Sequence, residues 1–343
     1  MSFTLRFPGP LPVTEKAGRT VVTTDGIEVP VTNLGKVFWP DEGITKGDLL
    51  AYYWNIARVI VRHLHDRPLT LKRMPDGVRG GTFFQRNAPD WTPGWVPLCA
   101  IEPADSKVDE TVVVHNRAHL LFVANLGAVE MHTLHSRCVR YDQPDYLVCD
   151  LDPMEPAGFD EALVVAHQLK IVLDHLGLRG YAKTSGATGV QVYVPVDEKH
   201  SYAETRGLAE AMGALIVRTA PELATMEWSI DRRSGKVFID HKMNRRAASL
   251  ASVYSVRPEP RGTVSAPITW DEVAERTVQP ADFTMETIFD RIERVGDLFE
   301  PVVHAPQDLD DALRTLGVRA SRSDISEGRL RAHVGQRTRT KRA

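Results

Sequence analysis

Three aspartates stand at the ends of two apolar segments, YLVCDLDP and VFID. Asp150 and Asp152 are separated by one residue, and successive side chains of a strand point to opposite faces, so we expect both carboxylates on one face. Two carboxylates this close repel each other unless a cation lies between them, and hard oxygen ligands favour Mg²⁺ or Mn²⁺. With Asp240 as a third ligand, the set predicts a two-metal site that activates an attacking 3′-hydroxyl and stabilises a departing pyrophosphate.

A turn rich in serine and glycine lies between the two acidic segments, in KTSGATGVQVYVP. Its small residues allow backbone amides to approach a triphosphate, and the hydroxyl of Ser185 adds a donor beside Gly186. Taken alone, an Asp-x-Asp pair is more often a surface loop or a helix cap, and a glycine turn is more often a plain hairpin. The parts in this order are more specific, and together they favour nucleotide chemistry.

Hydrophobic periodicity divides the rest of the chain into helices and strands that would position these motifs. Thr45 precedes an apolar pattern at helical spacing and is predicted to cap it. The predicted helices cover 46–64, 117–131, 159–177, 203–220, 285–299 and 308–317. Strands are predicted at 69–74, 82–86, 146–152, 181–184 and 190–196, with one hairpin at the Asp–Gly turn within 21–32 and another in which MEWSI and KVFIDHK flank 231–235.

The composition is that of a folded chain without a membrane segment. Of the 343 residues, 43% are hydrophobic and 25% are charged, which favours a packed core over disorder. The net charge of −3 counts against a broad coat on DNA and is compatible with a local basic groove. No apolar stretch approaches the roughly 18 residues of a membrane helix, and the N-terminus lacks an apolar signal core. We therefore expect a cytoplasmic protein.

The cysteines and the C-terminus carry two further expectations. Cys99, Cys138 and Cys149 form an odd, sparse set without metal-like spacing, which fits a reducing cytosol better than a disulfide framework. The end of the chain, RLRAHVGQRTRTKRA, is basic and contains no acidic residue. This composition predicts a solvated, disordered tail, with a phosphate-contacting arm as the alternative.

Ordered blocks between about Asn33 and Arg257 match one known family. They are NLGKVFWPDEGITKGDLL, RPLTLKRMPDG, TFFQRNAP, ANLGAVEMH, DLDP, TSGATG, RSGKVFIDHKMNR and VYSVR. On these blocks the chain resembles the polymerase domain of the bacterial ligase D end-joining proteins, within the archaeo-eukaryotic primase superfamily. The resemblance implies an α/β (α+β) fold of the primase-polymerase type, with a mixed, largely antiparallel central sheet flanked by helices. We expect residues 1–302 to form the catalytic domain and 303–343 a C-terminal extension.

The resemblance also implies roles for individual residues. The metal ligands and catalytic residues would be Asp150, Asp152 and Asp240. The incoming nucleotide or its phosphates would be contacted by Lys72, Arg73, His132, Ser185, Gly186, Gln191, Arg233 and Arg257. The 5′-phosphate of a broken end would be held by Lys36 and Lys46, and the template strand would pack against Phe83 and Phe84. Without the resemblance, the residue types alone indicate ordinary structural roles: surface lysines, core aromatics and a structural histidine.

The chain departs from the family pattern in the second motif. Many members end this motif with histidine, where this chain has Gln191, which donates a hydrogen bond to phosphate but cannot carry imidazolium charge. The basic residue common inside the same loop is replaced by Ala187 and Thr188. The ligase and phosphoesterase domains that often share the family's chain are absent, so we expect a stand-alone polymerase or a piece cut at a linker.

The resemblance implies a gap-filling, end-extending polymerase of non-homologous end joining that uses Mn²⁺ or Mg²⁺ and accepts NTPs and dNTPs. Its partners would be gapped or broken DNA with a 5′-phosphate, Ku and a separate DNA ligase. Three alternatives stay open at this point: a primase that starts chains de novo, a non-catalytic DNA-end-binding module and a metal-dependent nuclease. Lys36 and Lys46 favour the repair polymerase over the primase, and the three aspartates argue against the non-catalytic module.

Overall fold

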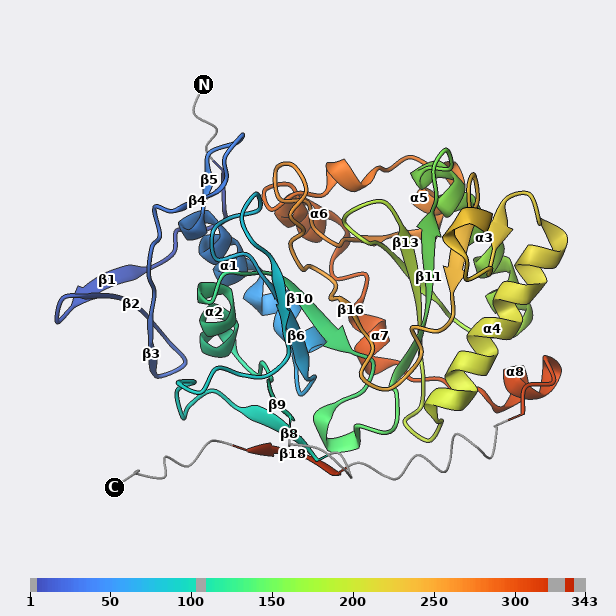
Figure 1. Cartoon of the computed structure of the whole chain (residues 1–343), viewed down its shortest axis with the longest axis horizontal. Coiled ribbons are helices and arrows are strands. Elements are labelled where there is room, and N and C mark those ends of the chain that lie inside the picture. The colour runs from blue at the N-terminus through green and yellow to red at the C-terminus, as the bar shows by residue number, and fades with distance from the viewer. Residues whose placement is uncertain (1–4, 103–108, 320–330, 336–343) are drawn as a thin grey trace.

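Two larger β-sheets and their covering helices organise the chain in a computed structural model that describes residues 5–102, 109–319 and 331–335. Figure 1 shows the two sheets in the middle of the molecule, with α1 and α2 on one flank and α3 and α4 on the other. The helices are α1 (Lys46–Leu64), α2 (Arg117–Asn125), α3 (Phe159–His175), α4 (Tyr202–Thr219), α5 (Trp270–Glu275), α6 (Ile288–Val295), α7 (Glu300–His304) and α8 (Asp310–Thr315).

The six-stranded sheet has the order β14-β15-β11-β13-β12-β17. Its strands are β11 (Tyr146–Pro153), β12 (Tyr181–Thr184), β13 (Val190–Pro195), β14 (Ala224–Thr225), β15 (Val237–Asp240) and β17 (Pro267–Ile268). Neighbouring strands are antiparallel except β14 and β15, which are parallel. Helices α3 and α4 pack against β11, and every residue of the central strand β13 is buried, which explains its nearly continuous apolar sequence.

The four-stranded sheet has the order β16-β10-β6-β7 and is antiparallel throughout. Its strands are β6 (Leu69–Arg73), β7 (Phe83–Gln85), β10 (Ala128–Leu134) and β16 (Ser249–Ala251). Helix α2 packs against β10, and α1 packs against α2. The two sheets and their helices confirm the predicted mixed, largely antiparallel α/β fold. Among the described residues, no helix has both the length and the apolar character needed to cross a bilayer.

Small sheets occupy the N-terminal region. β1 (Val13–Lys16), β2 (Arg19–Thr24) and β3 (Ile27–Pro30) form an antiparallel meander, and β4 (Val37–Trp39) pairs with β5 (Ile44–Thr45). The predicted Asp–Gly hairpin is confirmed between β2 and β3. Both turn residues have positive φ, 53° at Asp25 and 74° at Gly26, as a two-residue hairpin turn of the primed type requires.

Helix α1 begins where the sequence predicts. The Thr45 hydroxyl accepts a hydrogen bond from the Asp48 amide (3.2 Å), and the Asp48 carboxylate accepts one from the Thr45 amide (2.8 Å), which is a capping box. The helix buries an apolar face that includes Leu49, Ile56 and Ile60. This cap fixes the N-terminus of α1, and with it the position of the first helical residue, Lys46.

The helix predicted over 117–131 is too long. Helix α2 ends at Asn125, Gly127 has a φ of 75°, and β10 begins at Ala128. A Cβ at Gly127 would lie 3.1 Å from the Cα of Pro75, so the turn needs glycine for its conformation and for its lack of a side chain. The residues after the turn alternate as a strand, and this alternation turns the side chains of positions 130 and 132 to one face.

The hairpin predicted over 226–242 is wrong in its first half. Only β15 forms as expected, and its partner β14 is parallel to it and lies just before the predicted strand. Residues Ile230–Arg232 form a short 3₁₀ helix instead. The Arg233 guanidinium donates to the carbonyls of Glu227 (2.8 Å) and Trp228 (2.6 Å), which satisfies backbone acceptors that a strand partner would otherwise satisfy.

The C-terminal region also differs from its prediction. β18 (Arg331–Gly335) pairs antiparallel with β8 (Leu98–Glu102), which also pairs with β9 (Asp109–Val112), so the predicted disordered tail is wrong for these residues. The rest of the predicted tail, 329–330 and 336–343, lies outside the described residues. The helices predicted near 285–299 and 308–317 are confirmed as α6 and α8. The domain boundary at 302 stays a prediction.

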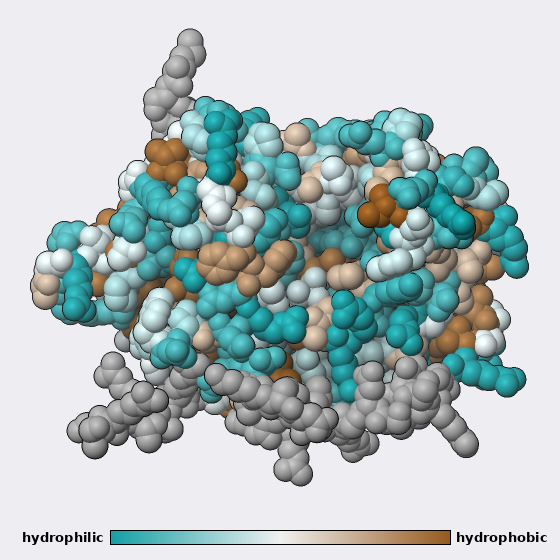
Figure 2. Space-filling model, in the orientation of Figure 1, coloured by the Kyte–Doolittle hydropathy of each residue, from teal (hydrophilic) through white to brown (hydrophobic). Residues whose placement is uncertain are grey.

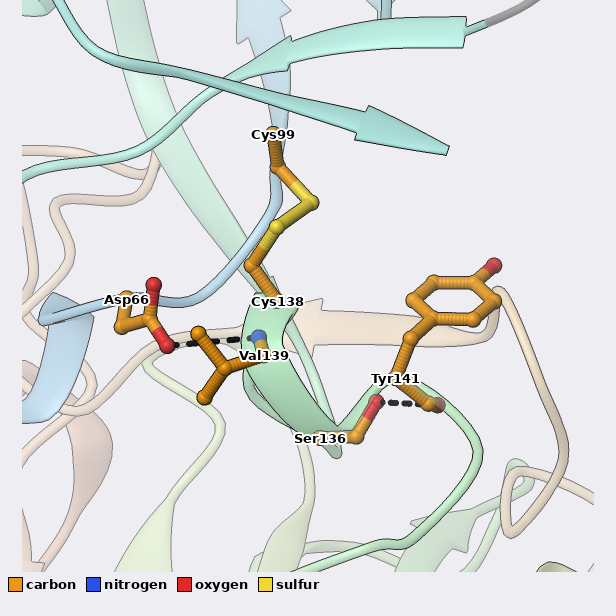
Figure 3. The surroundings of a disulfide bond; sticks show 6 residues. All are labelled: Asp66, Cys99, Ser136, Cys138, Val139 and Tyr141. Carbon is orange, nitrogen blue, oxygen red and sulfur yellow. Dashed lines mark hydrogen bonds between the residues drawn. A yellow bond between two sulfur atoms is a disulfide. The ribbon is translucent and has the colours of Figure 1, made fainter. Parts of the chain in front are cut away.

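The expectation that the cysteines are all reduced is wrong. Cys99 and Cys138 form a disulfide that joins β8 to the short 3₁₀ helix Cys138–Arg140, and Cys149 stays free and buried on β11. Figure 3 shows the disulfide beside Asp66, whose carboxylate accepts a hydrogen bond from the Val139 amide (3.4 Å). The two paired cysteines are 39 residues apart, so their spacing alone carries no sign of contact.

Candidate active site

The three predicted metal ligands lie on one face of the six-stranded sheet. Asp150 on β11 stands directly opposite Asp240 on β15 in antiparallel register, and Asp152 follows two residues later on β11. Residues directly opposite each other in an antiparallel pair share a face, as do residues two apart in one strand. The sheet therefore brings the three carboxylates to one place.

Burial and mutual repulsion disfavour the charged forms of Asp150 and Asp152. Desolvation, followed by the charge of Asp152, raises the pKa of Asp150 to about 8. Desolvation, followed by the charge of Asp240, raises the pKa of Asp152. A divalent cation would relieve this repulsion, and ligands that are all oxygen suit Mg²⁺ or Mn²⁺. The residues present therefore fit the metal ions that the resemblance implies.

A second group of possible metal ligands lies where α8 begins. The ligand atoms of His200, Asp308 and Asp310 lie within 4.8 Å of one another. However, the Lys199 ammonium lies 2.7 Å from the Asp308 carboxylate and 2.9 Å from that of Asp310, and the Leu309 amide donates to Nε2 of His200 (3.1 Å). These contacts already engage the ligand atoms of the three residues. We therefore interpret the group as structural rather than as part of the active site.

The serine–glycine turn is built around the hydroxyl of Ser185. Its oxygen accepts hydrogen bonds from the amides of Ala187 (3.2 Å) and Gly189 (3.0 Å), which leaves the O–H free to donate. Gly186 has a φ of 76°, and a Cβ there would lie 2.6 Å from the Cγ of Arg257. The glycine is thus required by its conformation and by the close approach of Arg257, which brings a guanidinium beside the turn.

Gln191 has a partner that the sequence did not predict. Its side chain is buried, and Nε2 donates to Oδ1 of Asp150 (2.9 Å) rather than pointing to a position open to a phosphate. Oε1 of Gln191 accepts a hydrogen bond from Lys183, whose ammonium also donates to Ser265 Oγ (2.6 Å) and to the Ala251 carbonyl (3.1 Å). Lys183 is 0% exposed, and this burial lowers its pKa to about 7. Lys183 therefore fixes the amide orientation that Gln191 presents to Asp150.

Glu130, which is wholly buried on β10, gathers three residues that the resemblance assigns to the nucleotide. Its carboxylate lies 2.6 Å from Lys72 Nζ, 2.8 Å from His132 Nε2 and 3.2 Å from an Arg257 guanidinium nitrogen. Burial alone would raise the pKa of Glu130, but the His132 hydrogen bond and the Arg257 charge hold it at about 2. Lys72 and Arg257 are two cations that share the single negative charge of Glu130. The cluster therefore has a net positive charge, which suits an anion.

The two predicted template aromatics are exposed on β7. Phe84 is 63% exposed and meets His132 edge to face at 5.6 Å between ring centroids, so it borders the Glu130 cluster. Phe83 lies under the guanidinium of Arg73 at 5.2 Å. The face drawn in Figure 2 is mostly hydrophilic, with hydrophobic residues in small, separate patches. Exposed aromatic rings of this kind can stack on unpaired bases without reading sequence.

Arg233 lies next to the carboxylate site through its packing on β15. Its guanidinium stands 3.5 Å from the ring centroid of Phe238, and Phe238 is the residue opposite Asp152 in the β11–β15 pair. The charge of Arg233 acts on Asp152 and partly offsets the rise in the pKa of that carboxyl. The structure thus places Arg233 with the predicted site, although the hairpin predicted to carry it does not form.

Lys36 and Lys46 line one pocket of about 410 Å³, together with Arg73. Lys46 is the first residue of α1, and its ammonium lies 2.8 Å from Asn125 Oδ1 and 3.3 Å from Thr32 Oγ1, both of which are neutral. Desolvation, followed by the charges of Lys36 and Arg73, lowers the pKa of Lys46 to about 8. Lys36 is also paired with the exposed carboxylate of Asp76 (2.6 Å). Three cations, one of them paired, around a cavity at a helix N-terminus would suit a multiply charged anion.

Strand β6 connects this pocket to the active site. Lys72 stands opposite Glu130 in the β6–β10 pair, whereas its neighbour Arg73 lines the lysine pocket. Adjacent strand residues point to opposite faces, so a single strand supplies both sites. Arg73, which the resemblance assigned to the nucleotide, is therefore placed with Lys36 and Lys46 instead.

Two residues of the site were given no role by sequence reasoning. Glu130 organises the basic cluster and Lys183 holds Gln191. Both stand inside quoted motifs, ANLGAVEMH and KTSGATGVQVYVP, in which other residues were assigned to the site. For Glu130 a signal was present in the alternation of AVEMHTL, which puts it on the same face as His132. For Lys183 the signal was a lysine inside an otherwise apolar strand.

Comparison with known proteins shows the family of this chain. A family model described as the LigD primase-polymerase domain matches residues 45–299. The multifunctional non-homologous end joining protein LigD of Mycolicibacterium smegmatis is 33% identical over 80% of this chain and 36% of its own length. The bifunctional non-homologous end joining protein LigD of Bacillus subtilis is 32% identical over 81% of this chain and 44% of its own length. The chain thus spans less than half the length of these relatives.

A solved structure shows the same fold. The polymerase domain of Mycobacterium tuberculosis ligase D, in complex with DNA, is similar to this chain with a TM-score of 0.75 and 29% identity, over 81% of this chain and 99% of the other. The fold and the site thus define a nucleotidyltransferase of the primase-polymerase type. Within that class, the chain belongs to the family of LigD primase-polymerase domains.

Proposed function

We propose that this chain is a template-directed DNA-end-repair polymerase that adds nucleotides to 3′ ends at gaps and breaks bearing a 5′-phosphate, in non-homologous end joining. The observation that carries the proposal is the pairing of two sites on one chain. A carboxylate site with a basic rim suits nucleotide addition, and the separate pocket of Lys36 and Lys46 suits a terminal phosphate. A general polymerase needs only the first site, whereas a gap-filling enzyme uses both.

The proposed roles of individual residues follow from the contacts described above. Lys72, His132 and Arg257, gathered on Glu130, and the free O–H of Ser185 would bind the triphosphate of an incoming NTP or dNTP. Arg233 would approach the primer terminus from its place beside β15.

The carboxylates would hold the metal ions. Asp150, Asp152 and Asp240 would bind Mn²⁺ or Mg²⁺, which when bound supplies Lewis-acid stabilisation of the reacting phosphoryl oxygens. Gln191 would keep one oxygen of Asp150 in a fixed orientation through its amide hydrogen bond. The exposed rings of Phe83 and Phe84 would stack against the template strand.

The relatives suggest the partners of this activity. Their names place them in non-homologous end joining, and this chain spans only the part of them that matches a polymerase domain. We therefore propose that it works with Ku and a separate DNA ligase on broken DNA in the bacterial cytosol or nucleoid.

The experiment that tests the proposal is primer extension on a gapped duplex. The downstream strand carries either a 5′-phosphate or a 5′-hydroxyl, and NTPs and dNTPs are compared with Mg²⁺ and with Mn²⁺. We expect extension that depends on the template base and is faster on the phosphorylated gap. Equal rates on both gaps would contradict the end-repair function. Product formation on a template without a primer would identify a primase, and no product with either metal would leave only the binding module.

A further inference from the structure

The pocket of Lys36 and Lys46 has an aromatic wall as well as a charged one. The pocket of about 410 Å³ is also lined by Trp91, Trp95 and Phe122. A phosphate group needs only the cations, so the aromatic part of the lining is left for another group of a ligand. The pocket therefore has the amphipathic lining of a site for a phosphate that carries a flat apolar group.

Trp91 is the exposed member of this wall. It is 65% exposed, whereas Phe122 is 6% exposed and belongs to the core. Trp91 meets Phe122 edge to face at 6.0 Å between ring centroids, which leaves much of the indole surface open. Hydrophobic burial therefore does not explain the position of this large ring, because most of its surface remains in water.

The segment that carries Trp91 is held by its own hydrogen bonds. The Thr92 amide and hydroxyl both donate to the Pro89 carbonyl, at 3.0 and 2.6 Å, and the Val96 amide donates to the Pro93 carbonyl at 3.0 Å. Trp91 thus extends from an ordered turn. An aromatic surface that is already positioned loses little conformational freedom when a ligand stacks on it.

We propose that Trp91 forms a stacking subsite for the terminal nucleoside of the 5′-phosphorylated DNA strand whose phosphate lies between Lys36 and Lys46. The inference rests on the proposed function, because it takes the 5′-phosphate end as the occupant of the pocket. Charge complementarity selects that occupant: three cations line the pocket, of which Lys36 is paired with the exposed carboxylate of Asp76 (2.6 Å). The polar partners of Lys46, Asn125 and Thr32, are neutral. The aromatic side adds a surface for a base, which any sequence satisfies.

The test compares the affinity of the wild type and of Trp91→Ala for three gapped duplexes at one salt concentration, by fluorescence anisotropy. The downstream strand begins with a 5′-phosphorylated nucleotide, with a 5′-phosphorylated abasic residue, or with an unphosphorylated nucleotide. Base stacking on an aromatic side chain is a sequence-tolerant contribution that corresponds to about tenfold in affinity. We expect the wild type to bind the intact phosphorylated end about tenfold more tightly than the abasic end, and Trp91→Ala to bind these two ends equally.

Two further variants serve as controls. Trp91→Phe keeps an aromatic face and should retain most of the preference for the intact end. Val139→Ala truncates another exposed apolar residue, which does not line the pocket, and should behave as the wild type. Competition with a free deoxynucleoside 5′-monophosphate distinguishes a DNA end from a soluble nucleotide: we expect weak competition, because the duplex adds further contacts.

Each outcome has a distinct meaning. If wild type and Trp91→Ala show the same preference for the intact end, the stacking subsite is overturned while the phosphate pocket stands. A wild type that binds the intact and abasic ends equally also overturns it. If the wild type does not distinguish the phosphorylated from the unphosphorylated nucleotide, the proposed end-repair function fails at its phosphate pocket. Tight competition by the free nucleotide would overturn the assignment of this subsite to a DNA end.

Discussion

Buried charged side chains determine how the exposed ones of this site are arranged. Glu130 has no exposed surface and holds Lys72, His132 and Arg257, so these three basic groups converge although they come from distant parts of the chain. Lys183 is buried as well, and its hydrogen bond to the side-chain oxygen of Gln191 orients that residue. Long basic side chains lose rotamer freedom when they are held, so prior placement by a buried partner reduces the cost of binding an anion.

The three aspartates that we propose as metal ligands provide the first prediction at this scale. We expect Asp240→Ala to lower the rate of nucleotide addition by more than about 100-fold, since loss of a direct ligand should exceed the effect of losing a partner of that ligand. DNA binding, which depends on phosphate contacts, should change little. Primer extension and anisotropy on the same duplex measure the two effects. Asp174→Ala, which removes an exposed carboxylate of α3, is the matched control. Near-normal extension by Asp240→Ala would rule out the carboxylate site.

Gln191 provides the second prediction. Gln191→Leu removes the hydrogen bond to Asp150 and leaves Lys183 with its bonds to Ser265 and the Ala251 carbonyl, so the fold should persist. Partners of metal ligands typically contribute 10- to 100-fold in metal affinity or activity. We expect the Mn²⁺ concentration needed for half-maximal extension to rise by about tenfold or more, with the affinity for DNA unchanged. An unaltered metal titration would show that Gln191 acts elsewhere, for example directly on the nucleotide.

Sequence reasoning located the aspartates because their spacing and strand-end positions are local features. It did not find the bond between Gln191 and Asp150, because that bond depends on which strands become neighbours. β11 lies between β13 and β15, and only this order puts residue 191 opposite residue 150. Nor did sequence reasoning find that Arg73, which the resemblance assigns to the nucleotide, lines the pocket of Lys36 and Lys46, because that depends on how strand β6 is turned.

At the scale of elements, local signals were reliable and pairing signals were not. The Thr45 cap of α1 and the Asp–Gly turn between β2 and β3 depend on residues within a few positions of one another, and both were predicted. The parallel pairing of β14 with β15 and the addition of β18 to β8 are long-range contacts, which no local pattern encodes. The helix predicted past Asn125 failed because a single glycine turn separates two apolar elements of different period.

The disulfide allows a prediction about the stability of these elements. Cross-linking residues 39 apart restricts the unfolded chain, so we expect the Cys99→Ser/Cys138→Ser variant to lower the free energy of unfolding by about 2–4 kcal/mol. Urea denaturation followed by circular dichroism measures the change. Reductant should destabilise the wild type by a similar amount and leave the double variant unaffected. If reductant has no effect on the wild type, the two cysteines are not bonded in solution.

In the whole molecule, the two larger sheets carry different groups of the proposed site residues. The six-stranded sheet carries the three aspartates, the four-stranded sheet carries Lys72, Arg73 and the exposed aromatics of β7, and Arg257 touches both the Ser185 turn and Glu130. The net charge of −3 does not reveal this arrangement, since a sum over the chain does not show where individual basic residues lie. A duplex with a gap would have to reach both sites at once, so recognition of the downstream end belongs to the whole molecule rather than to one residue.

At the scale of the whole molecule, we predict that the protein binds a 5′-phosphorylated DNA end selectively. We expect Lys36→Ala/Lys46→Ala to weaken binding to a 5′-phosphorylated gapped duplex by about 1–3 kcal/mol, the size of charge-assisted hydrogen bonds, and to change binding to the 5′-hydroxyl duplex much less. Anisotropy titrations at one fixed salt concentration measure both, because affinity for DNA depends steeply on salt. The matched control is Lys16→Ala/Lys170→Ala, which removes two lysines paired with acidic residues outside the pocket.

The pH dependence of the same titration isolates Lys46. Its pKa in the free protein is lowered to about 8 by burial and by Lys36 and Arg73, so Lys46 is charged at pH 7 and largely neutral at pH 9. A terminal phosphate has its second pKa near 6, so its own charge is nearly constant over that range. The preference for the phosphorylated end should therefore fall as the pH rises from 7 to 9, and Lys46→Ala should remove most of this dependence. A preference that is constant from pH 7 to 9, or a double variant that loses affinity for both duplexes alike, would show that these lysines form only a general basic patch.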